Sequence, residues 1–182
     1  KTKVHAENYL ANLSSLSLLD AIFAKARFGI EKHGVTAKLT DQRILTFENA
    51  RHPLIDPLHV VSNTYHITQN QSTLLITGPN TGGKTVSLKI IGLFTLMSYT
   101  GIPVLADEAL LPMFDQVYVD IGDDQSIQAS HSTFSAHLQK ISTICEKATG
   151  KSLIILDELG GGTDPVEGES LAMAVLNELR SR

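Results

Sequence analysis

Several features that specify particular protein classes are missing from this 182-residue chain. Its single cysteine, Cys145, excludes an internal disulfide framework and suits a reducing compartment, so we expect a cytoplasmic protein. No apolar run is long enough to cross a membrane, and the N-terminus lacks the basic-then-apolar pattern of a secretory signal. The sequence therefore predicts neither a membrane protein nor a secreted one.

Positive charge is also scarce. The formal net charge is −4 and no long basic run occurs, so this part of the protein offers no DNA-gripping surface of its own. The length suits one domain with a substantial core. The first residue is not Met and both ends fall inside helical patterns, so we expect a piece of a longer protein, truncated at its C-terminus.

A glycine-rich turn stands between two apolar segments near the middle of the chain. It has the spacing G-x-x-x-x-G-K-[ST] and consists of Gly78, Pro79, Asn80, Thr81, Gly82, Gly83, Lys84 and Thr85. Glycines let the backbone wrap its N–H groups around phosphates, and the helix that follows adds its N-terminal N–H groups and dipole. In such a loop the lysine reaches the β- and γ-phosphates and the last hydroxyl binds Mg²⁺. Taken alone, the motif could also be a plain strand-to-helix turn.

A second motif favours a nucleotide hydrolase. The continuous apolar run 152–156 ends at Asp157 and Glu158, downstream of the phosphate loop. An acid at the end of a buried strand can hold Mg²⁺, and its neighbour can act as the base for the attacking water. We therefore assign Asp157 to the metal and Glu158, with Lys84, to catalysis. The sequence has no Asn-Lys-x-Asp element for reading guanine, so ATP is the expected nucleotide.

The hydrophobic patterns predict an α/β fold of the phosphate-loop NTPase type. We expect a mostly parallel sheet flanked by helices, with a small antiparallel patch before the loop. Helices are expected over residues 5–32, 86–99, 132–148 and from 165 onward, and strands over 43–47, 65–68, 73–77, 103–105, 116–121 and 152–156. The leucine stripe of the first helix suits either a coiled-coil arm or a helix leading into the domain. Cys145 falls in the apolar stripe of the third helix and is expected to be a core residue.

Two further segments are unusual. Residues 130–134 contain Ser132 at the start of a helix, which is either an ordinary N-cap or an anion site for a nucleotide bound to a second protomer. Three consecutive glycines, Gly160 to Gly162, directly follow the acidic pair. They suggest that the backbone there approaches something closely, such as a partner subunit.

Together these motifs resemble the ATPase domain of the MutS proteins, ABC-type ATPases of DNA mismatch repair and recombination. The likeness covers roughly Thr46 to the C-terminus, and it rests on the phosphate loop, Ser132-Thr133-Phe134, the acidic pair with its glycines, and Arg51-His52-Pro53. Details resemble the second bacterial branch, MutS-like proteins that restrain homologous recombination. Those details are Thr81, Thr85, residues 121–127 and Gly162-Thr163-Asp164-Pro165.

The resemblance implies roles for particular residues. MutS ATPase domains pair head to tail as a homodimer, in which Ser132 would complete the partner's active site. Asn80 would lie near the γ-phosphate, and Val60 and Asn63 near the adenine. Asp107 takes the place of a glutamine that senses Mg²⁺ and water in ABC enzymes, and this departure puts the sensing role in question.

The resemblance also implies what surrounds this piece of chain. Residues 1–34 are expected to be a helix from the end of the lever and clamp region, and residues 35–182 the ATPase domain. Full-length proteins of this branch bind branched or junction DNA through the clamp, and a separate Smr domain is credited with endonuclease activity. Some are linked to splitting collided ribosomes.

Three functional readings follow. The first is an ATPase motor whose dimer closure drives a DNA clamp that suppresses recombination. The second is a nucleotide-gated dimerisation switch with little turnover, and the third is an ABC module that acts on ribosomes. A membrane transporter is disfavoured because the Leu-Ser-Gly-Gly-Gln signature is absent from the sequence.

Overall fold

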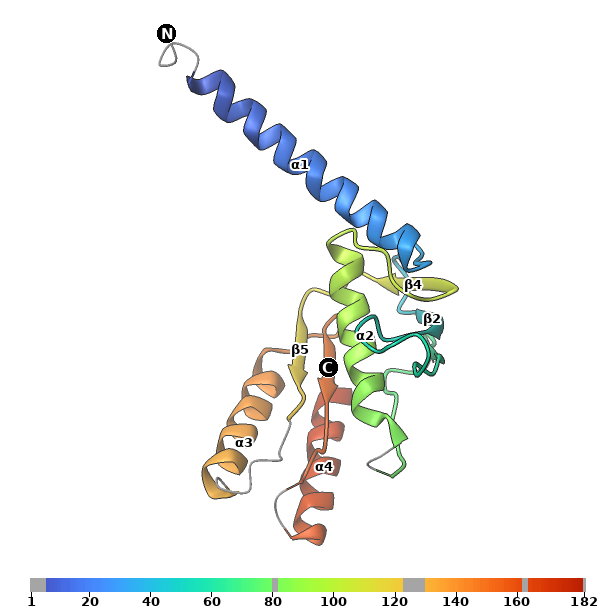
Figure 1. The fold of residues 1–182 in the computed structure, drawn as a ribbon. Coiled ribbons are helices and arrows are strands. Elements are labelled where there is room, and N and C mark those ends of the chain that lie inside the picture. The colour runs from blue at the N-terminus through green and yellow to red at the C-terminus, as the bar shows by residue number, and fades with distance from the viewer. Residues whose placement is uncertain (1–5, 80–81, 123–129, 162–163, 182) are drawn as a thin grey trace.

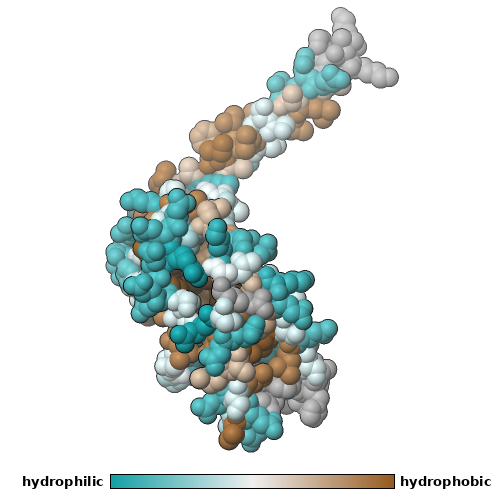
Figure 2. All heavy atoms as spheres, turned by 180° about the vertical axis from the view of Figure 1, so that it is seen from behind, coloured by the Kyte–Doolittle hydropathy of each residue, from teal (hydrophilic) through white to brown (hydrophobic). Residues whose placement is uncertain are grey.

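The computed structural model describes residues 6–79, 82–122, 130–161 and 164–181. Helix α1, Ala6–Glu31, projects from the rest of the molecule as a single rod (Figure 1). Its apolar side chains face solvent, and the hydrophobic surface along the projecting rod is visible in Figure 2. The most exposed of them are Tyr9, Leu10, Leu13, Leu16, Leu18, Ile22, Phe23 and Ile30. In the described part of the chain, no helix combines the length and the apolar character needed to cross a bilayer.

Only the C-terminal end of α1 docks onto the body of the molecule. Phe28 packs against the hydrophobic core, and Gly29 lies so close to Pro103 that an added Cβ would come within 2.7 Å of the proline ring. Lys25 Nζ donates a hydrogen bond of 2.6 Å to the carbonyl oxygen of Thr100, at the C-terminal end of α2. The first helix is therefore tied to the far end of the helix that follows the phosphate loop.

A four-stranded mixed sheet lies on one side of α2. Its strands are β1 (Lys38–Thr40), β2 (Leu45–Ala50), β3 (Asn63–Ile67) and β4 (Glu108–Pro112), in the order β1-β4-β2-β3. β2 runs antiparallel to both β3 and β4, whereas β1 and β4 are parallel. The antiparallel patch predicted before the phosphate loop is therefore present.

A two-stranded parallel sheet lies on the other side of α2. It consists of β5 (Val117–Asp120) and β6 (Leu153–Leu156), and the helices α3 (Ser130–Lys147) and α4 (Pro165–Arg180) accompany it. The carboxyl ends of β5 and β6 and the N-terminal ends of α2, α3 and α4 all point to the same end of the molecule (Figure 1). Unpaired helical N–H groups and dipoles therefore gather at one end of the fold.

Helix α2 (Lys84–Tyr99) forms the centre of the hydrophobic core, as its apolar sequence predicts. Phe94 is fully buried and meets Phe47 of β2 edge to face, with ring centroids 5.4 Å apart. On the opposite side, Gly92 lies against Ile155 of β6. The lack of a side chain at Gly92 lets strand β6 approach the helix closely, so one helix joins the two sheets.

The predicted helices agree with the structure to within two residues at the ends that the structure describes. The proposed start of α4 is confirmed, because Asp164 accepts a hydrogen bond from the N–H of Val166 and Pro165 occupies the first helical position. Cys145 is only half buried and is not among the buried core residues, although the sequence predicted that it would be; its neighbour Ile144 is buried.

The strand predictions contain several errors. Residues 73–77 form no regular strand, and Leu75 in that segment is 73% exposed. Residues 103–105 contribute only an isolated bridge between Val104 and Val35, while β1 and β4 were not predicted. A mostly parallel sheet is also not observed, since parallel and antiparallel pairings are equally represented among the described strands. A short apolar run becomes a strand only where another strand offers hydrogen bonds, and that pairing is not encoded locally.

Asp115 anchors the end of the parallel sheet that lies away from the clustered helix N-termini. Its carboxylate accepts hydrogen bonds from the hydroxyl groups of Thr149, at 2.5 Å, and Ser152, at 2.9 Å. The bond from Thr149 is the main reason that the pKa of Asp115 lies below its ordinary value. A carboxyl group whose pKa is lowered on folding stabilises the fold above its unfolded pKa, and this stabilisation is lost as the pH falls through the folded pKa.

We therefore predict that Asp115→Asn lowers the melting temperature at pH 7. The difference from the wild type should begin to shrink once the pH falls below the ordinary value of 3.8, because the unfolded chain then takes up the proton first. It should be lost as the pH falls through the lower pKa of the folded state. Thermal unfolding at a series of pH values measures this difference, with the exposed Asp41→Asn as the matched control. A difference that stays constant down to the acid limit would contradict the assignment.

Candidate nucleotide-binding site

The phosphate loop leads directly into α2. Gly83 precedes the helix with φ 78°, a left-handed conformation that favours glycine, and the N–H of Ser87 donates to its carbonyl oxygen. Earlier in the loop, the N–H of Gly82 donates to the carbonyl oxygen of Pro79. A glycine cap has no side chain to accept from the first N–H groups of the helix, which are the groups that bind phosphate in such loops. The predicted ligands Asn80 and Thr81 lie outside the described residues.

The lysine of the loop folds back over it. Lys84 Nζ donates to the carbonyl oxygen of Gly78 at 2.5 Å, so the amine spans the loop from its last part to its first residue. The cation is thereby held over the turn that would surround a phosphate. A phosphate oxygen would form a charge-assisted hydrogen bond with this amine, which is stronger than a bond to a neutral carbonyl.

The two predicted metal ligands meet in the structure. Thr85 Oγ1 donates to Asp157 Oδ2 at 2.7 Å, although the residues are 72 positions apart in the sequence. Asp157 follows β6 and is only 8% exposed, and its other oxygen accepts from the N–H of Glu158. Helix α2 and strand β6 therefore place a hydroxyl and a carboxylate side by side at the start of the phosphate-loop helix.

This pair fits Mg²⁺ rather than a metal that needs a protein cage. Among the described residues, no group of three or more His, Cys, Asp or Glu side chains could hold a metal ion. Mg²⁺ is usually bound by one or two protein oxygens together with water and nucleotide phosphates. Thr85 and Asp157 supply that number of oxygens beside the loop.

The acidic pair has two distinct environments. Asp157 is buried, whereas Glu158 is exposed and has φ 49°, an uncommon conformation for a residue with a side chain. The N–H of Gly161 donates to the carbonyl oxygen of Glu158 at 2.7 Å and closes a tight turn there. Strained backbone of this kind is often found at functional sites. The different burial suits the division into one metal ligand and one base.

The glycines after the acidic pair approach the backbone of the same chain. Gly160 has φ 87° and packs directly against the backbone of Gly168 in α4, so a Cβ at either position would overlap the other residue. The close approach predicted for this segment is therefore present, but its partner within the described residues is α4. Gly162 and Thr163 lie outside the described residues.

Of the two residues expected near the adenine, Asn63 lies beside the segment that leads into the phosphate loop. Asn63 begins β3 and lines a hollow of about 390 Å³, whose wall continues over residues 63–66 and 74–77 to Ser87 of α2. The hollow thus joins β3 to the segment that leads into the loop. Val60 lies three residues earlier, half buried, and its N–H donates to the carbonyl oxygen of Asp56.

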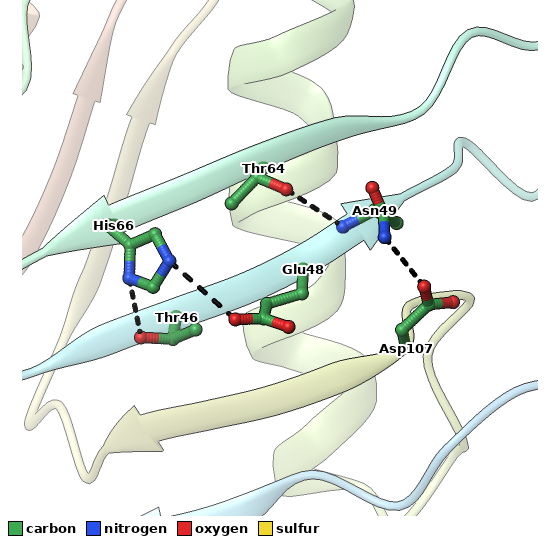
Figure 3. A network of polar contacts seen from close by, with 6 residues as sticks. All are labelled: Thr46, Glu48, Asn49, Thr64, His66 and Asp107. Atoms are coloured by element: carbon green, nitrogen blue, oxygen red, sulfur yellow. Dashed lines mark hydrogen bonds and ion pairs between the residues drawn. The ribbon is translucent and has the colours of Figure 1, made fainter.

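Asp107 belongs to a polar network on the sheet that contains β2, β3 and β4 (Figure 3). Its carboxylate accepts from Asn49 Nδ2 at 2.7 Å, and its N–H donates to the carbonyl oxygen of Glu48. Asn49 has φ 48°, and its own N–H donates to Thr64 Oγ1. The remaining members of the network are Thr46 and His66. The described contacts of Asp107 therefore hold a sheet corner together, and its role as a sensor stays a prediction.

Ser132 lies in the first turn of α3. The helix already begins at Ser130, so the reading of Ser132 as an N-cap is wrong. Its side chain lies outside the described part of the structure, so its action on a partner's nucleotide stays a prediction. Sequence reasoning missed two residues close by, Asp120 at the end of β5 and His137 on α3, whose side chains meet. One signal was available, because two apolar strands that both end in Asp bring those ends together when they pair in parallel.

Fold and site together define an ATPase domain of the phosphate-loop type with a mixed α/β structure. Residues 74–182 match the family described as MutS domain V. The chain is also similar to proteins named Endonuclease MutS2. It is 46% identical over 177 residues to the one from Clostridioides difficile (97% of this chain, 22% of the relative), and 48% identical over 180 residues to the one from Caldanaerobacter subterraneus (98% and 23%).

The chain belongs to the MutS family, in its MutS2 branch. A third relative, from Listeria welshimeri, is 50% identical over 167 residues, which are 91% of this chain and 21% of the relative. The chain therefore spans about a fifth of the length of the curated relatives that it matches. Those relatives contain a great deal of chain that has no counterpart here.

We predict that Thr85→Val weakens nucleotide binding about tenfold in the presence of Mg²⁺, because the hydroxyl ligand is lost. Thr85→Ser keeps the hydroxyl and should bind Mg²⁺ and ATP within about threefold of the wild type. Isothermal titration with ATP, in Mg²⁺ and again in EDTA, separates the metal-dependent part. Equal Mg²⁺ dependence in the valine and serine variants would contradict the assignment of Thr85 as a ligand.

We also predict that Gly168→Ala destabilises the protein. A helical Gly→Ala change normally gains about 1 kcal/mol, but here the added methyl group would overlap the backbone of Gly160, and overpacking costs about 1–3 kcal/mol. Urea unfolding measures the change, with Ser170→Ala on the exposed side of the same helix as the control. An alanine variant that is more stable than the wild type would show that the loop is not held against α4.

Proposed function

We propose that this domain binds ATP with Mg²⁺ and hydrolyses it. The observation that carries the proposal is the 2.7 Å hydrogen bond between Thr85 and Asp157. It joins the end of the phosphate loop to the end of a buried strand, which is the arrangement that phosphate-loop NTPases use to hold the metal. The remaining proposed ligands are Gly78, Pro79, Asn80, Thr81, Gly82, Gly83 and Lys84 for the phosphates and Val60 and Asn63 for the base.

Each residue has a distinct task in the proposed reaction. Bound Mg²⁺ supplies positive charge that offsets the charge of the phosphate oxygens, and Thr85 and Asp157 would hold it. Lys84 exchanges the carbonyl of Gly78 for phosphate oxygens. Glu158 accepts a proton from water as the water oxygen bonds to the γ-phosphorus and the bond to the bridging oxygen breaks, with its electron pair leaving on ADP.

We further propose that two copies share their active sites head to tail. The gathering of the N-terminal ends of α2, α3 and α4 at the carboxyl ends of β5 and β6 supports this arrangement (Figure 1). The first turn of α3 carries Ser132 and presents helical N–H groups at the same end of the molecule as the phosphate loop. A partner's γ-phosphate could therefore be bound by α3 while its other phosphates stay in the partner's own loop.

In the full-length protein we propose that this ATPase serves a DNA-binding machine that suppresses homologous recombination. Residues 1–34 would connect to the DNA-binding region and residues 35–182 would form the ATPase domain. The exposed apolar side chains of α1 support this, because they suit contacts with further chain, and the curated relatives are several times longer. Any endonuclease activity would lie in those further parts, and the alternative function is a nucleotide-gated switch that splits collided ribosomes.

The test is the mass of the full-length protein in solution with Mg²⁺ and ATP, together with its turnover. Glu158→Gln should form an ATP-stabilised dimer and lose turnover at least about a hundredfold, because the base is absent. Ser132→Ala should also lose turnover while it still binds ATP, because the partner's contribution is missing. Lys147→Gln, exposed on the same helix as Ser132, is the matched control and should retain wild-type turnover.

Other outcomes would redirect the proposal. Turnover that survives Ser132→Ala would leave Ser132 without a role in the partner's site and make the domain a self-contained ATPase. Full recombination control by the non-hydrolysing Glu158→Gln dimer would favour the nucleotide-gated switch over the motor. Loss of the dimer in every variant would contradict the shared site.

A further inference from the structure

A buried carboxylate lies next to the proposed metal site. Asp120 ends strand β5, is 4% exposed, and has Oδ2 at 2.6 Å from Nδ1 of His137 on α3. Lys140, one turn further along the same helix, places Nζ 3.5 Å from the other carboxylate oxygen. His137 is also largely shielded from solvent, whereas Lys140 is mostly exposed. Two nitrogen-bearing side chains of α3 thus converge on one acid of the sheet.

The same residue also supports the metal ligand through its backbone. Because β5 and β6 are parallel with Asp120 opposite Leu156, the carbonyl oxygen of Asp120 accepts the N–H of Asp157 at 2.9 Å. Asp157 in turn accepts the hydroxyl of Thr85. A continuous path therefore runs from α3 through the ends of β5 and β6 to the phosphate-loop helix.

The burial of Asp120 makes its side-chain partner matter. Burying a carboxylate away from water costs free energy unless the carboxylate is paired. Among the described residues, His137 is the group that lies close to Oδ2 of Asp120, and no hydrogen bond to this oxygen meets the geometric criteria. This requirement favours one position of α3 along the sheet. Because His137 comes five residues after Ser132, a rise of about 7.5 Å at 1.5 Å per residue, the contact also determines where the first turn of α3 lies.

We propose that Asp120 and His137 form a positioning pair that sets the first turn of α3 relative to the Thr85–Asp157 site. Neither residue is a catalytic residue, since each acts through the helix or strand that carries it. The inference rests on the proposed sharing of active sites, because α3 would present Ser132 to a partner's nucleotide. The first turn of α3 would serve the partner's active site, whereas strand β6 carries the metal ligand of the subunit's own site. Through this pair, the position of that turn depends on the strands of the subunit's own site.

The test uses turnover and ATP affinity of the full-length protein carrying His137→Gln or Asp120→Asn. Turnover should fall about tenfold or more, since a misplacement of about 1 Å can cost a hundredfold in rate. The affinity of the full-length protein for a fluorescent ATP analogue should stay within about twofold, because the phosphate loop is unaltered. The exposed Gln139→Ala on the same helix is the matched control and should leave both quantities unchanged.

Rescue distinguishes positioning from simple stabilisation. The double variant Asp120→His with His137→Asp restores the pair in reverse, and it should recover turnover relative to either single variant. The inference would be overturned by variants that melt at a lower temperature but show wild-type turnover at a temperature where they are fully folded. In that case the pair would only stabilise the fold. If Asp120→Asn fails to fold, His137→Gln decides the question by the same two measurements.

Ser132→Ala, run beside these variants, separates this inference from the proposed function. Turnover lost in Ser132→Ala but kept in His137→Gln overturns the positioning pair alone. Turnover kept in Ser132→Ala overturns the shared active site, and the positioning inference with it. Turnover lost in both, with ATP affinity preserved, supports both.

Discussion

The hydrogen bond between Thr85 and Asp157 is the contact on which the proposed chemistry depends. It joins two segments that are 72 residues apart and belong to different layers of the fold. The hydroxyl comes from the first turn of a helix whose middle is buried, and the acid comes from the end of a strand that packs on the same helix. The site is therefore only as well ordered as the packing of α2 against β6. The contact of Gly92 with Ile155 is part of that packing.

Features of this chain that depend on neighbouring residues could be predicted from the sequence alone. The helices agree because their long apolar or periodic runs exceed the length of a strand and have recognisable ends, such as the Asp164 cap of α4. The phosphate loop and acidic pair could be recognised because their chemistry needs particular residue types at short spacing. Their meeting in space then followed from the expectation that both lie at the carboxyl end of strands.

Features that depend on distant pairing could not be read in the same way. The apolar run at 73–77 looks like a strand, yet the structure pairs it with nothing regular, whereas β4 carries the charged Glu108 and pairs with two strands. Asp107 was considered as a metal sensor, but its partner Asn49 lies 58 residues away and could not be foreseen. His137 looked like an ordinary helix residue. Its partner Asp120 lies on strand β5, and the contact exists only once β5 has paired with β6 and α3 has packed beside them. In each case the missing information is which segments become neighbours, and no local pattern contains it.

The attachment of α1 has a mechanical consequence. The helix is held to the C-terminal end of α2 by Lys25 and by the contact of Gly29 with Pro103, while the phosphate loop lies at the opposite end of α2. At about 1.5 Å per residue, α2 is about 24 Å long and α1 about 39 Å. If the two move as one rigid body, a tilt of about 5° moves the free end of α1 by about 3 Å, by simple rod geometry. The junction of the two helices then lies about 24 Å from the phosphate loop and about 39 Å from the free end of α1. A displacement beside the phosphates would therefore arrive at the far end of the rod about one and a half times as large.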